Sequence, residues 1–210
     1  MKIALVVENS QAGKSDIIHD ALTSVVKPMG HEVFHYGMYT PEDKAHLTYP
    51  MNGLLSGVLL NSGAADFVVT GCGTGMGSML ACNAMPNIFC GLVIDPTDAF
   101  LFSQINAGNA IAMPFAKGFG WAAELNLQDC FQKLFETEAG LGYPRERAEV
   151  MRTNRGVLAD LKKVTCHDML TILKNADQEL LKTAISGERF AEYFYPNSQD
   201  DDISAFLKDL

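Results

Sequence analysis

The sequence has little positive charge and no long apolar run, and each shortage excludes a class of protein. Its 210 residues carry 16 lysines and arginines against 25 aspartates and glutamates, a formal net charge of −9. Nucleic-acid affinity comes largely from cations that neutralise phosphates, so we expect no nucleic-acid partner. The chain has no run of about eighteen apolar residues, so we expect no membrane span.

The five cysteines are few and spread out, without a C-x-x-C pair, and the five histidines lack metal-motif spacing. This pattern is typical of reduced thiols rather than of a disulfide framework or a structural zinc site. We therefore expect a cytoplasmic protein without a bound metal. Hydrophobic residues make up 48% of the chain, which excludes disorder as the dominant state.

Short apolar runs alternate with helical patterns along most of the chain. The expected strands are 2–7, 31–36, 67–70, 88–94 and 110–113. The expected helices are 16–28, 51–62, 77–85, 97–106 and 117–135. Strands that alternate with helices imply a parallel sheet covered on both faces. With right-handed crossovers, this predicts an α/β fold, a three-layer Rossmann-like sandwich on a five-stranded parallel sheet.

The last third of the chain has helical periodicity and no further strand. Apolar residues recur at helical spacing from Thr165, and Thr165 with Asp168 fits a capping box, so Cys166 would lie at a helix start. We expect an α/β domain over 1–142. Residues 143–210 would form a C-terminal helical extension that packs on this domain or on a partner subunit.

One loop concentrates the chemistry. Residues 71–78, Gly-Cys-Gly-Thr-Gly-Met-Gly-Ser, follow the third expected strand, and ligands of parallel sheets bind at such carboxyl ends. Glycines let several backbone N–H groups converge, and the next helix adds its positive end. These groups should lower the pKa of Cys72 and favour its thiolate. A thiolate beside N–H donors suits proton abstraction next to a carbonyl, with the donors holding the enediolate.

Simpler interpretations of the same features remain open. Cys72 could be a buried cysteine in a tight strand–helix turn. Residues 12–15, Ala-Gly-Lys-Ser, look like the end of a phosphate-binding P-loop, but Glu8 stands where the leading glycine should be. The glycine spacing of 73–77 differs from the dinucleotide fingerprint, so we expect no nicotinamide cofactor. Trp121 is expected on a helical face, in the core or at an interface.

The loop and its flanks resemble the ribose-5-phosphate isomerase B and galactose-6-phosphate isomerase family. The resemblance lies in residues 72–83, 95–99 and 106–109, with Tyr49-Pro50 upstream, and covers about residues 1–152. It implies a metal-free aldose–ketose isomerase without a cofactor, as a homodimer or homotetramer with sites built across subunits. Its partner would be a small sugar phosphate or sugar acid.

The resemblance also implies residue roles. Cys72 would be the base that moves a proton between C1 and C2, with Thr74 as the other candidate catalytic residue. Arg147 matches an arginine that grips phosphate, often from the neighbouring subunit, and Asn106 matches an asparagine that contacts substrate. The candidate substrate-binding residues are Glu8, Asn9, Gly73, Gly75, Met76, Gly77, Ser78, Asn106, Lys117 and Arg147.

Several positions depart from the family pattern. Glu8-Asn9 replaces an Asp-His pair, and Ile105 replaces the histidine that opens the sugar ring. Two family arginines fall at Ala116 and about Tyr143, and Lys117 is no equivalent for a planar guanidinium fork.

Two hypotheses follow from these departures. The first is an isomerase of an open-chain substrate, either a tetrulose phosphate or a deoxy-hexosulose uronate. The second is a non-catalytic family member that binds a sugar acid or partners another subunit.

Overall fold

Five strands form one parallel sheet in the computed structural model, which describes residues 1–210. The strands are β1 (Lys2–Val7), β2 (Glu32–His35), β3 (Phe67–Cys72), β4 (Cys90–Leu92) and β5 (Ala110–Pro114). Their spatial order is β2-β1-β3-β5-β4. The α/β fold with a five-stranded parallel sheet is therefore confirmed, although β4 is shorter than the expected 88–94.

Ten α-helices and three single-turn elements complete the chain. The first five helices are α1 (Ser15–Val26), α2 (Tyr49–Asn61), α3 (Met76–Asn83), α4 (Pro96–Leu101) and α5 (Ala123–Phe135). The later ones are α6 (Ala148–Thr165), α7 (Met169–Asn175), α8 (Gln178–Ala184), α9 (Phe190–Asn197) and α10 (Asp201–Lys208). The single turns are η1 (Asn9–Lys14), the π-helical η2 (Phe102–Asn106) and η3 (Arg145–Arg147).

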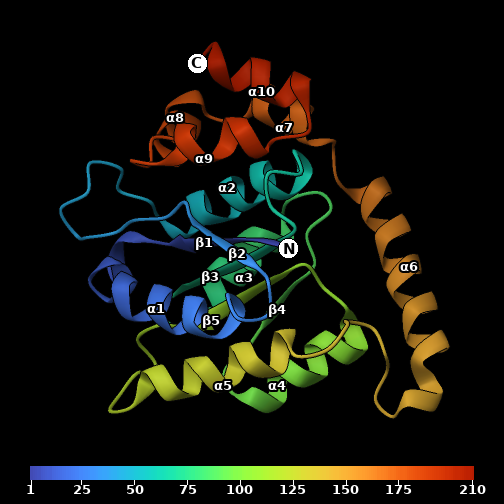
Figure 1. Ribbon diagram of the computed structural model, residues 1–210. Coiled ribbons are helices and arrows are strands. Elements are labelled where there is room, and N and C mark those ends of the chain that lie inside the picture. The colour runs from blue at the N-terminus through green and yellow to red at the C-terminus, as the bar shows by residue number, and fades with distance from the viewer.

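Side chains alternate between the two faces of the sheet, as the pleat of a strand requires. Ile3 and Leu5 of β1 join a cluster with α1, α4 and α5, whereas Ala4 and Val6 join a cluster with α2 and the C-terminal helices. Figure 1 shows α1, α4 and α5 on one side of the sheet and α2 on the other. The sheet is covered by helices on both faces, which explains why its strands are continuous apolar runs in the sequence.

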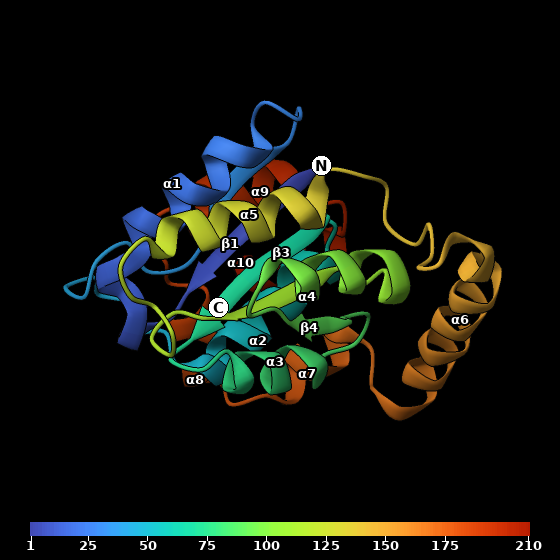
Figure 2. The same ribbon diagram turned by 90° about the horizontal axis from the view of Figure 1, so that it is seen from below.

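The C-terminal helices divide into two groups. Helices α7 to α10 lie over α2 and contribute Leu173, Phe194 and Ile203 to its cluster. Helix α6 instead stands beside the body, and none of its residues is buried (Figure 2). The C-terminal extension is helical throughout, while the domain boundary at residue 142 stays a prediction. No helix combines the length and the apolar character needed to cross a membrane.

One expected helix start and one expected helix end are wrong. Helix α5 begins at Ala123 rather than 117, because Gly118 and Ala122 adopt the left-handed conformation and interrupt the helix. Trp121 lies in the preceding turn and is fully exposed, so it is not a core residue. The expected helix 97–106 ends its α-helical part at Leu101 and continues as the π-turn η2.

The expected capping box of Thr165 and Asp168 is also wrong. Thr165 is the last residue of α6, and Cys166 follows it as the C-cap rather than starting a helix. Asp168 caps α7 without a contribution from Thr165. Its carboxylate accepts a hydrogen bond from the backbone N–H of Thr171 at 2.9 Å. The apolar periodicity from Thr165 therefore spans a helix end and two short helices. The acidic run at 200–202 begins the last helix, because the Asp200 side chain caps α10.

Helices α2 and α3 meet at a glycine. A Cβ on Gly53 would lie 2.4 Å from the backbone carbon of Ala81, whereas one on Gly156 of α6 would meet nothing within 4 Å. We expect Gly53→Ala to lower the free energy of unfolding by about 1–3 kcal/mol through overpacking. Gly156→Ala should raise it by about 0.5–1 kcal/mol. Urea denaturation followed by circular dichroism measures both, and equal stability of the two variants would contradict this packing.

Candidate active site

The carboxyl ends of β1 and β3 meet at one edge of the sheet. Val7 pairs with Gly71, and Cys72 pairs with Pro114 of β5. Glu8 therefore follows β1 at the level of Cys72. The chain leaves these two neighbouring strands in opposite directions, because β1 leads to β2 and β3 leads towards β4 and β5. A crevice at such a switch point is where parallel α/β sheets bind ligands.

The loop after β3 is a tight turn that starts α3 at once. Gly75 is the N-cap of α3 and has φ of 77°. A Cβ there would lie 2.6 Å from Leu92 Cδ1 and 2.9 Å from the backbone carbon of Met113. Glycine is thus required at position 75 both for its left-handed backbone and for space. The turn brings the first N–H groups of α3 back towards Cys72.

The Cys72 thiol is 9% exposed and lies among hydrogen-bond donors. Burial raises the pKa of this thiol. The N–H groups of Ser78, Thr74 and Gly77 and the Ser78 hydroxyl together lower the pKa by more than burial raises it. The net pKa is below the ordinary thiol value. The Ser78 oxygen is buried and has no hydrogen-bond partner elsewhere in the chain's network, so its hydroxyl is free to donate to the charged thiol. The loop therefore stabilises a thiolate at the end of β3.

The other loop residues have different surroundings. The Thr74 side chain is exposed, and its hydroxyl accepts from the backbone N–H of Met76 at 3.4 Å. The Met76 side chain is also exposed. Gly73 accepts through its carbonyl from the N–H of Lys117 at 2.8 Å, which leaves the exposed Lys117 side chain beside the loop. Gly73, Gly75, Gly77 and Ser78 thus lie together with Cys72, as expected.

A buried asparagine of α2 holds the carboxyl ends of β1 and β3 together through hydrogen bonds. Asn52 of α2 is fully buried, and its amide donates to Thr70 Oγ1 at 3.0 Å. The Thr70 hydroxyl in turn donates to the carbonyl of Val6 at 2.7 Å. These bonds join α2, β1 and β3 directly before Cys72. The sequence analysis missed Asn52, because nothing in the helical pattern of 51–62 distinguishes it from a surface polar residue.

Glu8 and Asn9 diverge after β1. Glu8 is 4% exposed, and its carboxylate accepts from the backbone N–H of Ser10 at 3.0 Å and from the Ser10 hydroxyl. Asn9 is exposed and is fixed only through its backbone N–H, which donates to the carbonyl of Leu47 at 2.7 Å. Glu8 is therefore the better placed of the two for a contact near Cys72.

Gln11 and Lys14 join the site without having been expected there. The Lys14 ammonium donates to Gln11 Oε1 at 2.7 Å and to the carbonyl of Phe115. Gln11 Nε2 donates to Ser10 Oγ at 2.9 Å, and it lies 3.8 Å from where a Gly73 Cβ would be. Lys14 belongs to the segment that looked like a P-loop, but η1 folds that segment into a 3-10 turn.

Asn106 and Arg147 lie away from Cys72 within one chain. Asn106 ends η2, which returns the chain to the amino end of β5, and Cys72 pairs with Pro114 at the other end. The four residue steps from Ala110 to Pro114 span roughly 13 Å at the rise of a β-strand. Arg147 is exposed in η3, after a segment hydrogen-bonded to η2. Within one chain, neither residue therefore lies at the Cys72 loop.

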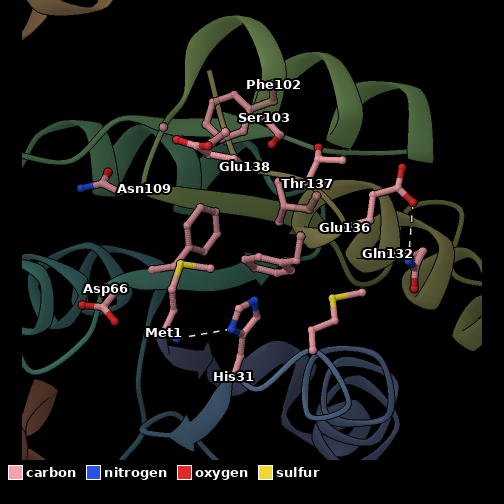
Figure 3. Close-up of a pocket in the computed structure, with 16 residues that line it drawn as sticks. Met1, His31, Asp66, Phe102, Ser103, Asn109, Gln132, Glu136, Thr137 and Glu138 are labelled. Carbon is pink, nitrogen blue, oxygen red and sulfur yellow. Dashed lines mark hydrogen bonds between the residues drawn. The ribbon is translucent and has the colours of Figure 1, made fainter. Parts of the chain in front are cut away.

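A cavity of about 740 Å³ lies at the amino edge of the sheet and does not contain Cys72 (Figure 3). Its polar lining includes Asp66, Glu138 and His31, whose Nδ1 is 3.3 Å from the Met1 amine. Burial lowers the pKa of His31, and the charged amine lowers it further. Because ligands of parallel sheets bind at the carboxyl edge, we assign the chemistry to the Cys72 loop. No three His, Cys, Asp or Glu side chains are grouped to hold a metal ion.

Two family models match this chain. One, described as Ribose/Galactose Isomerase, matches residues 3–140, and another, described as Ribose-5-phosphate isomerase, matches residues 164–210. The chain is 56% identical to a 4-deoxy-L-threo-5-hexosulose-uronate ketol-isomerase crystallised with a tartrate. That match covers 100% of this chain and 98% of the other, with a TM-score of 0.98.

Two ribose-5-phosphate isomerases are also similar in structure. The one from Vibrio parahaemolyticus is 47% identical over 100% of this chain and 98% of its own, with a TM-score of 0.97. The type B enzyme from Clostridium thermocellum is 22% identical over 79% of this chain and 99% of its own. Its TM-score of 0.62 indicates a shared fold.

The donor role of Ser78 can be tested on the thiol itself. Removing its hydroxyl takes away a hydrogen bond to the charged form, so Ser78→Ala should raise the pKa of Cys72. Thiolate is lost as the pH falls through the pKa, so the alkylation profile of the variant should move to higher pH. The measurement is the rate of Cys72 alkylation by iodoacetamide against pH. A profile that stays in place would contradict the role of the hydroxyl.

Proposed function

Because the chain belongs to the ribose/galactose isomerase family and is an aldose–ketose isomerase, we propose that it acts on an open-chain sugar acid with Cys72 as the base. The observation that carries this proposal is the Cys72 thiol, whose pKa the surrounding N–H groups lower. The 56% identity to a hexosulose-uronate isomerase supports the substrate class.

The residues that differ from the family pattern fit such a substrate. Ile105 stands in the position of the ring-opening histidine and cannot transfer a proton. A 4-deoxy-5-hexosulose uronate has a ketone at C5 and no hydroxyl at C4, so neither carbon can close a ring on the C1 aldehyde. Its anion is a carboxylate rather than a phosphate, which suits a site with Ala116 and Tyr143 in place of arginines. A tetrulose phosphate would also be open-chain, but it would need those arginines.

The reaction moves one proton between neighbouring carbons. The Cys72 thiolate takes the proton from C2, and the electrons of that C–H bond form the C1–C2 double bond of an enediolate. The carbonyl electrons shift to the C1 oxygen, which becomes the oxyanion. The C2 hydroxyl then passes its proton to the C1 oxygen, and its O–H electrons form the C2 ketone. The electrons of the C1–C2 double bond take the proton back from the thiol at C1, which leaves a CH2OH group there.

The backbone after Cys72 would hold the charge that develops in this step. The N–H groups of Thr74 and Gly77 face the sulfur, and they are fixed by the turn at Gly75. Donors fixed before the reaction cost no reorganisation when the oxyanion forms. Glu8 lies at the same level and, as a carboxylate, would accept from a substrate hydroxyl. Thr74 contributes through its backbone, since its hydroxyl is used within the loop.

A second copy of the chain would complete the site. Asn106 and Arg147 match substrate-contacting positions of the family but lie at the opposite edge of the sheet from Cys72 in the same chain. Helix α6 supports this assembly because five of its apolar residues are at least half exposed. They are Val150, Val157, Leu158, Leu161 and Val164.

The attachment of α6 leaves this apolar stripe free. The helix is held to the body by its cations, through Arg155 over the Phe89 ring at 3.3 Å and Lys162 donating to Asn83 O at 2.9 Å. Residues 150, 157, 161 and 164 lie on one helical face. We propose that this face packs on a second copy and brings Asn106 towards the partner's loop. A homodimer is the smallest assembly that allows this, and a tetramer would contain the same pair.

Replacing the base tests the chemistry. Cys72→Ser should lower turnover of the hexosulose uronate by about 100- to 10,000-fold, because a serine hydroxyl does not ionise in this pH range. The measurement is turnover together with deuterium incorporation into product in D₂O. Full exchange in the variant would remove Cys72 as the base. Thermal stabilisation of the wild-type protein by the uronate without any exchange would favour a non-catalytic binding protein.

Mixing two inactive variants tests the shared site. If each site takes Cys72 from one chain and Asn106 from the other, a heterodimer of Cys72→Ser and Asn106→Ala contains one intact site. Co-refolding equal amounts should therefore restore activity to about a quarter of the wild-type value. Neither variant alone should be active above its background. A mixture no more active than the sum of its parts would contradict a site built from two chains.

A further inference from the structure

Lys14 is the cation best fixed beside the Cys72 loop, and the mechanism above does not use it. We propose that Lys14, positioned by Gln11, binds the substrate carboxylate and selects a sugar acid over a sugar phosphate. This inference rests on the proposed function, and it identifies the group that recognises the anion.

The position of Lys14 follows from its hydrogen bonds. Its ammonium donates to the carbonyl of Phe115, and the N–H of Phe115 donates to the carbonyl of Cys72 at 2.9 Å. One residue therefore links the lysine to the strand end that carries the thiol. The ammonium also lies 4.7 Å from the centre of the Phe119 ring, which adds a cation–π contact. These contacts hold a normally flexible side chain at the carboxyl edge.

Gln11 fixes the ammonium from the other side. The Gln11 side chain is buried, with its carbonyl oxygen accepting from Lys14 at 2.7 Å. Its amide nitrogen donates to Ser10 Oγ at 2.9 Å, and the Ser10 hydroxyl donates to Glu8. The resulting chain of bonds orients the Gln11 amide and therefore the lysine. The same amide lies over Gly73, next to the catalytic loop.

The Lys14 ammonium has one N–H donor and a positive charge that no other group of the chain uses. An ammonium has three N–H donors, and the two hydrogen bonds of Lys14 use two of them. The side chain is only half-buried, so the third donor can reach a bound molecule. Lys14 forms no ion pair with any aspartate or glutamate of the chain. Its positive charge is therefore not neutralised by the protein.

The chemistry of a single ammonium favours a carboxylate. Lysine acts as a point charge, whereas a phosphate dianion is best held by planar arginine forks. The two positions that are arginines in the family pattern are Ala116 and Tyr143 here, and Ala116 is the one beside the Cys72 loop. In a six-carbon uronate with its C1–C2 end at the thiol, the carboxylate is at the far end of the chain. Lys14 then offers one positive charge to one negative charge.

Substrates that differ only in this charge test the proposal. The full-length enzyme is assayed with the hexosulose uronate and with its methyl ester, which has the same carbon chain without the negative charge. Lys14→Gln should raise the KM for the uronate by about 10- to 100-fold and change kcat less. The KM for the ester should stay the same. Lys27→Gln, an exposed lysine at the far end of α1, should change neither.

Each outcome decides one statement. If Lys14→Gln leaves the KM for the uronate unchanged, the inference is overturned and the proposed function still stands. If the KM rises equally for the uronate and the ester, the inference is also overturned, and Lys14 has a structural role instead. Lys14→Arg, which retains the charge, should keep most of the uronate affinity. If the wild-type enzyme turns over neither substrate, the proposed function fails. Calorimetric titration with tartrate, a dicarboxylate, then decides the inference: weaker binding to Lys14→Gln supports it, and equal binding overturns it.

Discussion

The rest of the proposed site depends on the N–H groups and the hydroxyl that lie around the Cys72 sulfur and favour its charged form. Burial makes a thiol less reactive, as at Cys130, where burial and, to a smaller extent, the nearby carboxylates of Asp95, Asp129 and Asp98 raise the pKa to about 12. Cys72 is also buried, yet the N–H groups of the loop and the Ser78 hydroxyl reverse the direction of the shift. The reversal requires a turn so tight that only glycine fits at position 75. The shape of the loop and the reactivity of the cysteine are therefore one feature.

The charge of the chain and the charge of its ligand have the same sign. A net charge of −9 repels anions in general, so affinity for a sugar acid has to come from local groups. In the proposed reaction the loop amides would hold the charge that develops, and Lys14 would face the charge that the substrate brings. In the proposed assembly the exposed face of α6 would pack on a second copy, which would bring Asn106 to this site. Assembly would bring further polar groups to it and exclude water.

The part of the site that is continuous in sequence was predictable. The run of alternating glycines around Cys72 sits directly after an apolar strand, so its residue types and position alone indicated an N–H cradle. Gln11 and Lys14 were missed because their contacts with Gly73 and Phe115 join loops that follow different strands. The P-loop likeness of that segment also drew attention to phosphate rather than to the neighbouring loop. Trp121 and Thr165 were misplaced because helical periodicity does not show where a left-handed residue or a cap interrupts a helix.

The central claim is that the pKa of the Cys72 thiol lies below that of an ordinary thiol, and NMR of protein labelled with ¹³C at the cysteine β-carbons measures this directly. The Cys72 signal is identified by its absence in Cys72→Ala, and its chemical shift is followed as the pH is changed. The account predicts a titration midpoint below that of an ordinary thiol, while the Cys130 signal stays in its thiol form throughout. A Cys72 midpoint at or above the ordinary thiol value would contradict it.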